Sequence, residues 1–190
     1  MCDLATTRLK LTGPYSELVG FTVKGYSEEN DFDFRKLRPI PKDLVETEHE
    51  NLSEEKKNEF IKKYGFYNSF DWRCENWDTK WNSEVLTPWN YESELSEDGQ
   101  IKKPNTFGGY HQISILFNTA WCPPINLISS LSKEYPNVTF EMYSYYERTL
   151  STSYVHIKDG VVDPMQYPDE DSEEEKKVLD IITPKEGDQE

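Results

Sequence analysis

The densest group of residues that could bind a ligand or act in catalysis lies in the stretch 65–81. Three of the five tryptophans fall there, and side chains of both charges stand between them. Trp and Arg are enriched where protein interfaces concentrate their binding energy, so one interpretation is a recognition surface. The alternative is a structural role, with the charges paired and the indoles packed under a sheet. The candidate binding residues are Trp72, Arg73, Glu75, Asn76, Trp77, Lys80 and Trp81, together with Trp121 farther along the chain.

A catalytic role for this stretch would need Asp71 or Glu75 as general base and Lys80 as electrostatic stabiliser, in a cleft that shifts their pKa values. Motifs of the common enzyme classes are missing. No histidine stands three or four residues from another histidine or a cysteine, and the three cysteines form no Cys-x-x-Cys pair. Phosphate loops, dinucleotide-binding glycines and nucleophile elbows are absent too. The sequence therefore predicts no catalytic residue, no metal and no cofactor, and it favours a binding protein over an enzyme.

The second candidate site is the acidic C-terminal segment, residues 163–190. It holds eleven acidic side chains against three lysines, and so carries −8 of the net charge of −15. Such runs are most often disordered and solvated, which we expect here. The other interpretation is a tail that imitates DNA phosphates or docks on a basic protein, with an apolar anchor that folds on binding. The acidic binding residues would be Asp169, Glu170, Asp171, Glu173, Glu174 and Glu175, and the anchor Val178, Leu179, Ile181 and Ile182.

The composition limits the class of protein. A chain of 190 residues suits one domain with extensions. It holds no run of about 18 apolar residues and no secretory signal pattern, so we expect a cytoplasmic protein without membrane contact. Because basic groups bind phosphate backbones, the acidic balance argues against direct nucleic-acid binding. The oligomeric state stays open at this level.

Apolar periodicity predicts the elements that position these residues. The alternation is clearest over 111–118, where only Leu116 breaks it. The order strand, helix, strand, strand, helix, strand predicts an α+β fold of the ferredoxin-like, split βαβ kind, with one antiparallel sheet and two helices on one face. The predicted strands cover 6–12, 81–89, 111–118, 138–143 and 153–157, and the predicted helices cover 15–23, 53–64 and 124–135.

The domain is expected to span 1–162, with an inserted helix within about 43–66 and a mobile loop over about 91–109. Residues 30–42 contain Pro39 and Pro41 and favour an extended connection. The sheet face away from the helices could stack bases on exposed aromatics, as in RNA-binding sheets. Side chains that could lie there are Arg8, Lys10, Tyr143 and Tyr145.

Five separated segments resemble one protein family. They are 7–13, 39–41, 72–81, 117–124 and 135–136, which read Thr-Arg-Leu-Lys-Leu-Thr-Gly, Pro-Ile-Pro, Trp-Arg-Cys-Glu-Asn-Trp-Asp-Thr-Lys-Trp, Phe-Asn-Thr-Ala-Trp-Cys-Pro-Pro and Tyr-Pro. In this order they are similar to the YubB or Api92-like proteins of phages, plasmids and other mobile elements. The resemblance covers about residues 4–157. It implies a ferredoxin-like domain and a mobile-element setting in a bacterial host, and it supplies no reaction.

The chain departs from this family's pattern at three places. Asp78 stands where Gly is usual, Cys122 where Ser is usual, and residues 1–5 replace an Asn-Trp-Cys start. The tail beyond about 160 is expected to be an addition of this chain.

Three functions remain in view. The leading hypothesis is a non-catalytic protein-binding module of a phage or other mobile element, whose acidic tail inhibits a basic host nucleic-acid-processing or defence protein. An enzyme acting on nucleic acid or nucleotides through carboxylates near Glu75 is the first alternative. A nucleic-acid binder through the open sheet face is the second.

Overall fold

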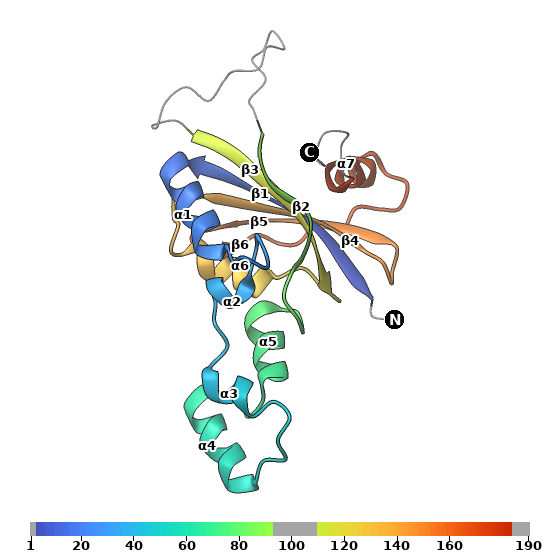
Figure 1. The fold of residues 1–190 in the computed structure, drawn as a ribbon. Coiled ribbons are helices and arrows are strands. Elements are labelled where there is room, and N and C mark those ends of the chain that lie inside the picture. The colour runs from blue at the N-terminus through green and yellow to red at the C-terminus, as the bar shows by residue number, and fades with distance from the viewer. Residues whose placement is uncertain (1–2, 93–109, 184–190) are drawn as a thin grey trace.

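The computed structural model describes residues 3–92 and 110–183, and within them six strands form one antiparallel sheet of order β2-β3-β1-β4-β5-β6 (Figure 1). The order β2-β3-β1-β4, with one helix after β1 and one after β3, is the ferredoxin-like arrangement, so the predicted fold class is confirmed. β5 and β6 extend the sheet beyond it. The strands are β1 (Leu4–Pro14), β2 (Glu84–Glu92), β3 (Tyr110–Ala120), β4 (Thr139–Tyr146), β5 (Ser151–Lys158) and β6 (Val161–Val162).

The core lies between the sheet and two helices on one of its faces, α1 (Tyr15–Gly25) and α6 (Ile125–Ser132) (Figure 1). Alternating residues of the strands point into it because side chains of a strand have a period of two. The helices contribute residues at spacings of three and four. The fully buried side chains of this core include Leu9, Leu11, Leu18, Phe21, Ile113, Ile115, Phe117, Leu127, Ile128 and Phe140.

Four helices are inserted between α1 and β2 within the described residues. The helix expected at 53–64 is confirmed: it begins after Ser53, whose hydroxyl caps the N–H of Lys56, and ends at Gly65 with a φ of 81°. The connection over 30–42 was predicted to be extended, but it contains a short helix, which Asp33 caps through the N–H of Arg35. The inserted helices are α2 (Phe34–Leu37), α3 (Lys42–Glu46), α4 (Glu54–Tyr64) and α5 (Ser69–Trp77).

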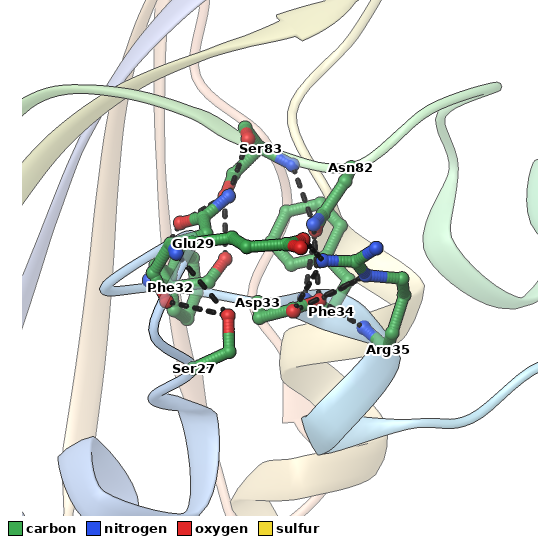
Figure 2. Close-up of polar contacts among 9 residues, drawn as sticks. Ser27, Glu29, Phe32, Asp33, Phe34, Arg35, Asn82 and Ser83 are labelled. Carbon is green, nitrogen blue, oxygen red and sulfur yellow. Dashed lines mark hydrogen bonds and ion pairs between the residues drawn. The ribbon is translucent and has the colours of Figure 1, made fainter.

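A group of polar contacts ties the two ends of this insertion together (Figure 2). Asn82 donates from Nδ2 to Oδ1 of Asp33 at 3.0 Å, and its own Oδ1 accepts the N–H of Phe34 at 2.8 Å. Arg35 donates from Nε to Oδ1 of Asp33 at 2.9 Å. Burial would raise the pKa of Asp33, but hydrogen bonds from Arg35 and Ser27 outweigh it and leave this pKa below its ordinary value. We call this group the clasp; it consists of Asn30, Asp33, Arg35, Asn82 and Ser83.

The C-terminal segment was predicted to be disordered, and this is wrong for residues 173–182, which form helix α7 (Glu173–Ile182). The helix lies on the sheet face opposite α1 and α6 (Figure 1). Its buried residues Val178 and Ile182 pack against Leu116 of β3. This contact explains why Leu116 breaks the alternation of its strand, because both faces of the sheet are covered at that point. The acidic run concealed a pair of apolar residues four positions apart, the spacing of one helix face.

Ser172 and Glu175 form a reciprocal cap at the start of α7. The Ser172 hydroxyl accepts the N–H of Glu175 at 3.0 Å, and the Glu175 carboxylate accepts the N–H of Asp171 at 2.7 Å. One acidic side chain of the run, that of Glu175, therefore acts in a helix start. Most of the loop predicted at 91–109 lies outside the described residues. Among the helices of the described part of the chain, none has the length and apolar character that crossing a membrane requires.

Candidate protein-interaction surface

The structure divides the predicted binding residues into a buried group and an exposed group. Trp72 and Trp77 belong to the buried group, with 7% and 1% of their surface exposed, and their rings meet edge to face at 5.9 Å. Trp77 donates from Nε1 to the carbonyl oxygen of Arg38 at 3.0 Å. These two indoles lie on α5 and pack it onto the core. Of two further residues of the predicted set, Arg73 ties α5 to Glu48, whereas Asn76 bonds to the carbonyl of Trp72 within the same helix.

The exposed group gathers around one lysine. The Nζ of Lys80 lies 4.4 Å from the ring centroid of Trp81 and 4.7 Å from that of Trp121. Phe70, in the first turn of α5, meets Trp121 edge to face with ring centroids 6.2 Å apart. The exposed fractions are 43% for Phe70, 38% for Trp81 and 45% for Trp121. We call these four residues, Phe70, Lys80, Trp81 and Trp121, the aromatic patch.

Sequence reasoning missed Phe70. The stretch 69–77 forms a helix, in which residues two positions apart point about 200° apart. Phe70 and Trp72 therefore cannot both face the core, and Trp72 does. Only the assignment of a helix to 69–77 would have shown from the sequence that Phe70 faces away from the core.

Two turns carry the patch, and Thr79 joins them. Its buried hydroxyl donates to the carbonyl of Ala120 at 3.1 Å and accepts the N–H of Ala120 at 3.0 Å. Lys80 and Trp81 follow Thr79 directly, and Trp121 follows Ala120. Trp121 has a φ of 72°, a left-handed conformation that is strained for a bulky residue. Such strain persists where the surrounding structure fixes it, and it is common at functional positions.

A hollow of about 590 Å³ adjoins the patch at Cys122, next to Trp121. Asp78 lines it at the end of α5, with a φ of 61°. Gly adopts such a left-handed position most easily, and Gly is the residue that the family resemblance led us to expect there. The Asp78 carboxylate accepts the backbone N–H and, at 2.8 Å, the side-chain amide of Asn126, so it caps the start of α6. The hollow is also lined by Pro123, Ile125, Tyr146, Thr149, Ser151, Met165 and Tyr167.

Two of the positions that depart from the family pattern touch each other in this hollow. The Cys122 thiol donates to the carbonyl oxygen of Asp78 with a separation of 2.7 Å. Burial, and then the charge of Asp78, raise the pKa of Cys122 to about 11. Burial likewise raises the pKa of Asp78 above its ordinary value. A thiol of this kind stays protonated near neutral pH, which makes it a poor nucleophile.

The catalytic hypothesis combines Asp71 or Glu75 with Lys80. Asp71 and Glu75 are exposed on α5, and Asp71 accepts a hydrogen bond from Asn68 at 2.7 Å. The Nζ of Lys80 instead faces two indole rings. Over the described residues, no group of three or more His, Cys, Asp or Glu side chains could hold a metal ion. This arrangement supports binding through aromatic surface better than acid–base chemistry.

The acidic tail residues are divided too. Glu175 is buried in the cap of α7, Leu179 is 37% exposed, and Ile181 is half-buried. Val178 and Ile182, expected to anchor the tail on a partner, are buried against this chain's own sheet. The expected open sheet face is thus covered by α7 around Leu116 and its neighbours. The acidic residues that remain exposed are Asp169, Glu170, Asp171, Glu173 and Glu174.

Comparison with known proteins gives one family. The model of the ferredoxin-like domain in Api92-like protein matches residues 73–184, more than half of the chain. Neither a curated protein nor a solved structure matches the chain. The match includes α7, so the expectation that the segment beyond about 160 is this chain's own addition is wrong. The match and the strand order together lead to one conclusion: the chain belongs to the family of Api92-like proteins that carry this ferredoxin-like domain.

Proposed function

We propose that this chain is a non-catalytic protein-binding module and that the aromatic patch is its binding surface. The contact of one lysine with two exposed indoles carries the proposal. Exposed aromatic surface is unfavourable in water, and its removal from water on binding contributes affinity. Trp is among the residues that most often dominate the binding energy of an interface. Thr79 holds the two turns together, so the surface is preorganised and loses little entropy when a partner docks.

The charge around the patch suggests a basic partner. Asp71 and Glu75 are exposed on the same helix as Phe70, and the whole chain carries −15. A basic surface would be attracted by this field over about 10 Å at moderate salt. Arginine side chains of such a partner can stack on indoles and pair with carboxylates at the same time.

The biological role in this proposal is inhibition of a basic host protein that processes nucleic acid or acts in defence. The proposal includes a phage or mobile-element setting and, with it, the cytoplasm of a bacterial host, and the resemblance to the Api92-like proteins supports both. The exposed acidic residues before and on α7 would add to the attraction, while the aromatic patch would supply the specific contacts.

Affinity capture from host lysate tests the proposal. The wild-type chain is compared with the double variant Trp81→Ala/Trp121→Ala and with the control Tyr26→Ala/Leu86→Ala, whose residues are 55% and 47% exposed away from the patch. We expect a basic protein that the control retains and the patch variant loses by at least about tenfold, since a hot spot contributes about 2 kcal/mol or more. Retention should also fall as salt rises.

Binding of the purified partner by titration calorimetry then measures the loss directly. Equal capture by patch variant and control would contradict the proposal. A patch that only joins two copies of this chain would contradict it as well. Light scattering would then show a dimer for the wild-type chain and a monomer for Trp81→Ala/Trp121→Ala.

A further inference from the structure

The sheet face beneath α7 combines aromatic and cationic side chains. In the strand register Arg8 of β1 pairs with Tyr143 of β4, and Tyr143 pairs with Tyr154 of β5. The rings of Tyr143 and Tyr154 are stacked, with centroids 6.2 Å apart and planes 25° apart. Two residues farther along β1, on the same face, Lys10 pairs with Glu141. Tyr145, His156 and Lys158 occupy further positions of the same face.

The part of this face that α7 contacts, on β1, β4 and β5, has more basic than acidic positions. It holds Arg8, Lys10 and Lys158 against the carboxylate of Glu141, while β2, at the edge of the sheet, places Glu84 and Glu92 on the same face. The whole chain carries −15. A cationic and aromatic surface in an acidic protein suits an anionic ligand with flat rings, because the cations attract the charge and the tyrosines stack on the rings.

The helix that covers the face is itself acidic. Its first turn holds Glu173, Glu174 and Glu175. At its other end, Arg8 donates from Nε to the carbonyl oxygen of Ile181 at 3.0 Å. That carbonyl lies at the C-terminal end of the helix, where the backbone carries partial negative charge. The guanidinium of Arg8 therefore already binds a negatively polarised group, and this group belongs to the chain's own tail.

The attachment of α7 is limited to a small area. Only three of its residues are buried: Glu175, Val178 and Ile182. The chain before it pairs with β5 as far as Gln166, whose N–H and carbonyl both bond to Tyr154. Between that pair and Ser172 the connecting segment is mostly exposed. Few side chains thus attach the helix to the sheet, and it forms none of the strand pairs.

From these relations we infer that the face under α7 is a binding site for single-stranded nucleic acid, and that α7 occupies it as an internal substitute for that ligand. Tyr143 and Tyr154 stack on bases, and Arg8 and Lys10 contact phosphates once α7 is displaced. In the form that the structure describes, α7 covers the site. This site is separate from the aromatic patch, so it stands independently of the proposed function.

The test releases α7 in the full chain and measures binding of a fluorescein-labelled oligothymidylate of about 15 nucleotides. The releasing variant is Val178→Asp/Ile182→Asp. The charge-matched control, Leu179→Asp/Thr183→Asp, adds the same charge at exposed positions of the helix and its end. We expect fluorescence anisotropy to show at least tenfold tighter binding by the releasing variant than by wild type or control. The affinity should fall between about 50 and about 200 mM salt.

Adding Tyr143→Ala/Tyr154→Ala to the releasing variant should return the affinity to that of wild type. Unchanged affinity in a releasing variant whose α7 amides exchange freely overturns the inference. A gain that the tyrosine substitutions leave intact overturns it as well, and so does a released face that binds only a second copy of the chain. If the releasing variant does not fold, hydrogen exchange of the wild-type chain tests the inference. Saturating oligothymidylate should then speed the exchange of amides in residues 174–182. Unchanged exchange would refute the site.

Discussion

Arg8 and Ile181 are 173 positions apart, yet the Nε of Arg8 lies 3.0 Å from the carbonyl oxygen of Ile181. Arg8 is buried, with 5% of its surface exposed, and it belongs to β1, which pairs with both β3 and β4 in the middle of the sheet. The contact therefore joins the last described helix to the first strand. It attaches α7 to the sheet, and this attachment depends on few side chains.

Replacing this arginine should loosen α7 selectively. Arg8→Met keeps the aliphatic stem but removes a charged hydrogen bond, which contributes about 1.5–3 kcal/mol. We expect the protection of amides 176–182 against hydrogen exchange to fall by roughly ten- to hundredfold, while amides of β3 keep theirs. Arg148→Met, at an exposed arginine, is the matched control and should change neither. Equal loss of protection in α7 and β3 would show that the contact supports the whole fold instead.

The covered face also shows where prediction from sequence stops. Strand β3 was predicted within two residues because its core-facing side chains alternate, and Leu116 was visible as an exception. The sequence alone held no means to decide what covers Leu116, since the covering pair Val178 and Ile182 lies in an acidic run typical of disorder. The contact between Leu116 and α7 can be identified only in the folded structure, where the two segments lie against each other.

The Trp-rich stretch 65–81 shows a second limit of prediction from sequence. Its role as a fixing element follows from composition, and Trp72 and Trp77 do lie in the core. Which indoles stay exposed depends on the helix over 69–77 and on the left-handed turn at Asp78, and the mixed pattern of charges and aromatics specifies neither. Lys80, Trp81 and Trp121 could therefore be predicted as candidate binding residues, but their grouping with Phe70 in one exposed surface could not.

The clasp should stabilise the whole domain. Asn82→Ala removes a donor from the buried Asp33 carboxylate and an acceptor from the N–H of Phe34. Leaving such groups without partners costs about 1–3 kcal/mol each, so we expect the free energy of unfolding to drop by about 2–4 kcal/mol in urea titrations. Asn51→Ala, at an exposed asparagine, should stay within about 0.5 kcal/mol of wild type. A similar small effect at Asn82 would mean that the two ends of the insertion are not tied through these bonds.

The clasp also predicts that the stability of the domain depends on pH. The pKa of Asp33 is lowered in the folded chain, so the folded state binds this proton less tightly than the unfolded state. Its contribution to stability is present above the unfolded pKa of about 3.8 and is lost as pH falls through the folded value. Asp33→Asn should be less stable than wild type at pH 7, and the gap should narrow as the pH falls to about 3. Urea titrations at several pH values measure it, and a constant gap would exclude this role for the Asp33 charge.

Lys80 should order the aromatic patch. Its two contacts with indole rings contribute about 0.5–1 kcal/mol each at exposed positions, so Lys80→Ala should lower the free energy of unfolding by about 1–2 kcal/mol. Lys80→Arg keeps a cation over both rings and should recover most of that loss. Tryptophan fluorescence should report the change, because Trp81 and Trp121 become more accessible to acrylamide without the lysine. Quenching that is the same in all three proteins would show that Lys80 does not order the patch.

Cys122 should be an unreactive thiol in the folded chain. Its pKa of about 11 lies two units above the ordinary 9.0, so at pH 8 the reactive thiolate is about a hundredfold scarcer. In a chain with Cys2→Ser and Cys74→Ser, iodoacetamide should label Cys122 at pH 8 at least about a hundredfold more slowly when folded than when unfolded in urea. The rate should rise with pH toward a midpoint near 11. Because burial causes most of the shift and Asp78 the next part, Asp78→Asn should move the midpoint down only modestly. A midpoint near 9 in the folded protein would show that burial and the contact with Asp78 do not control this thiol.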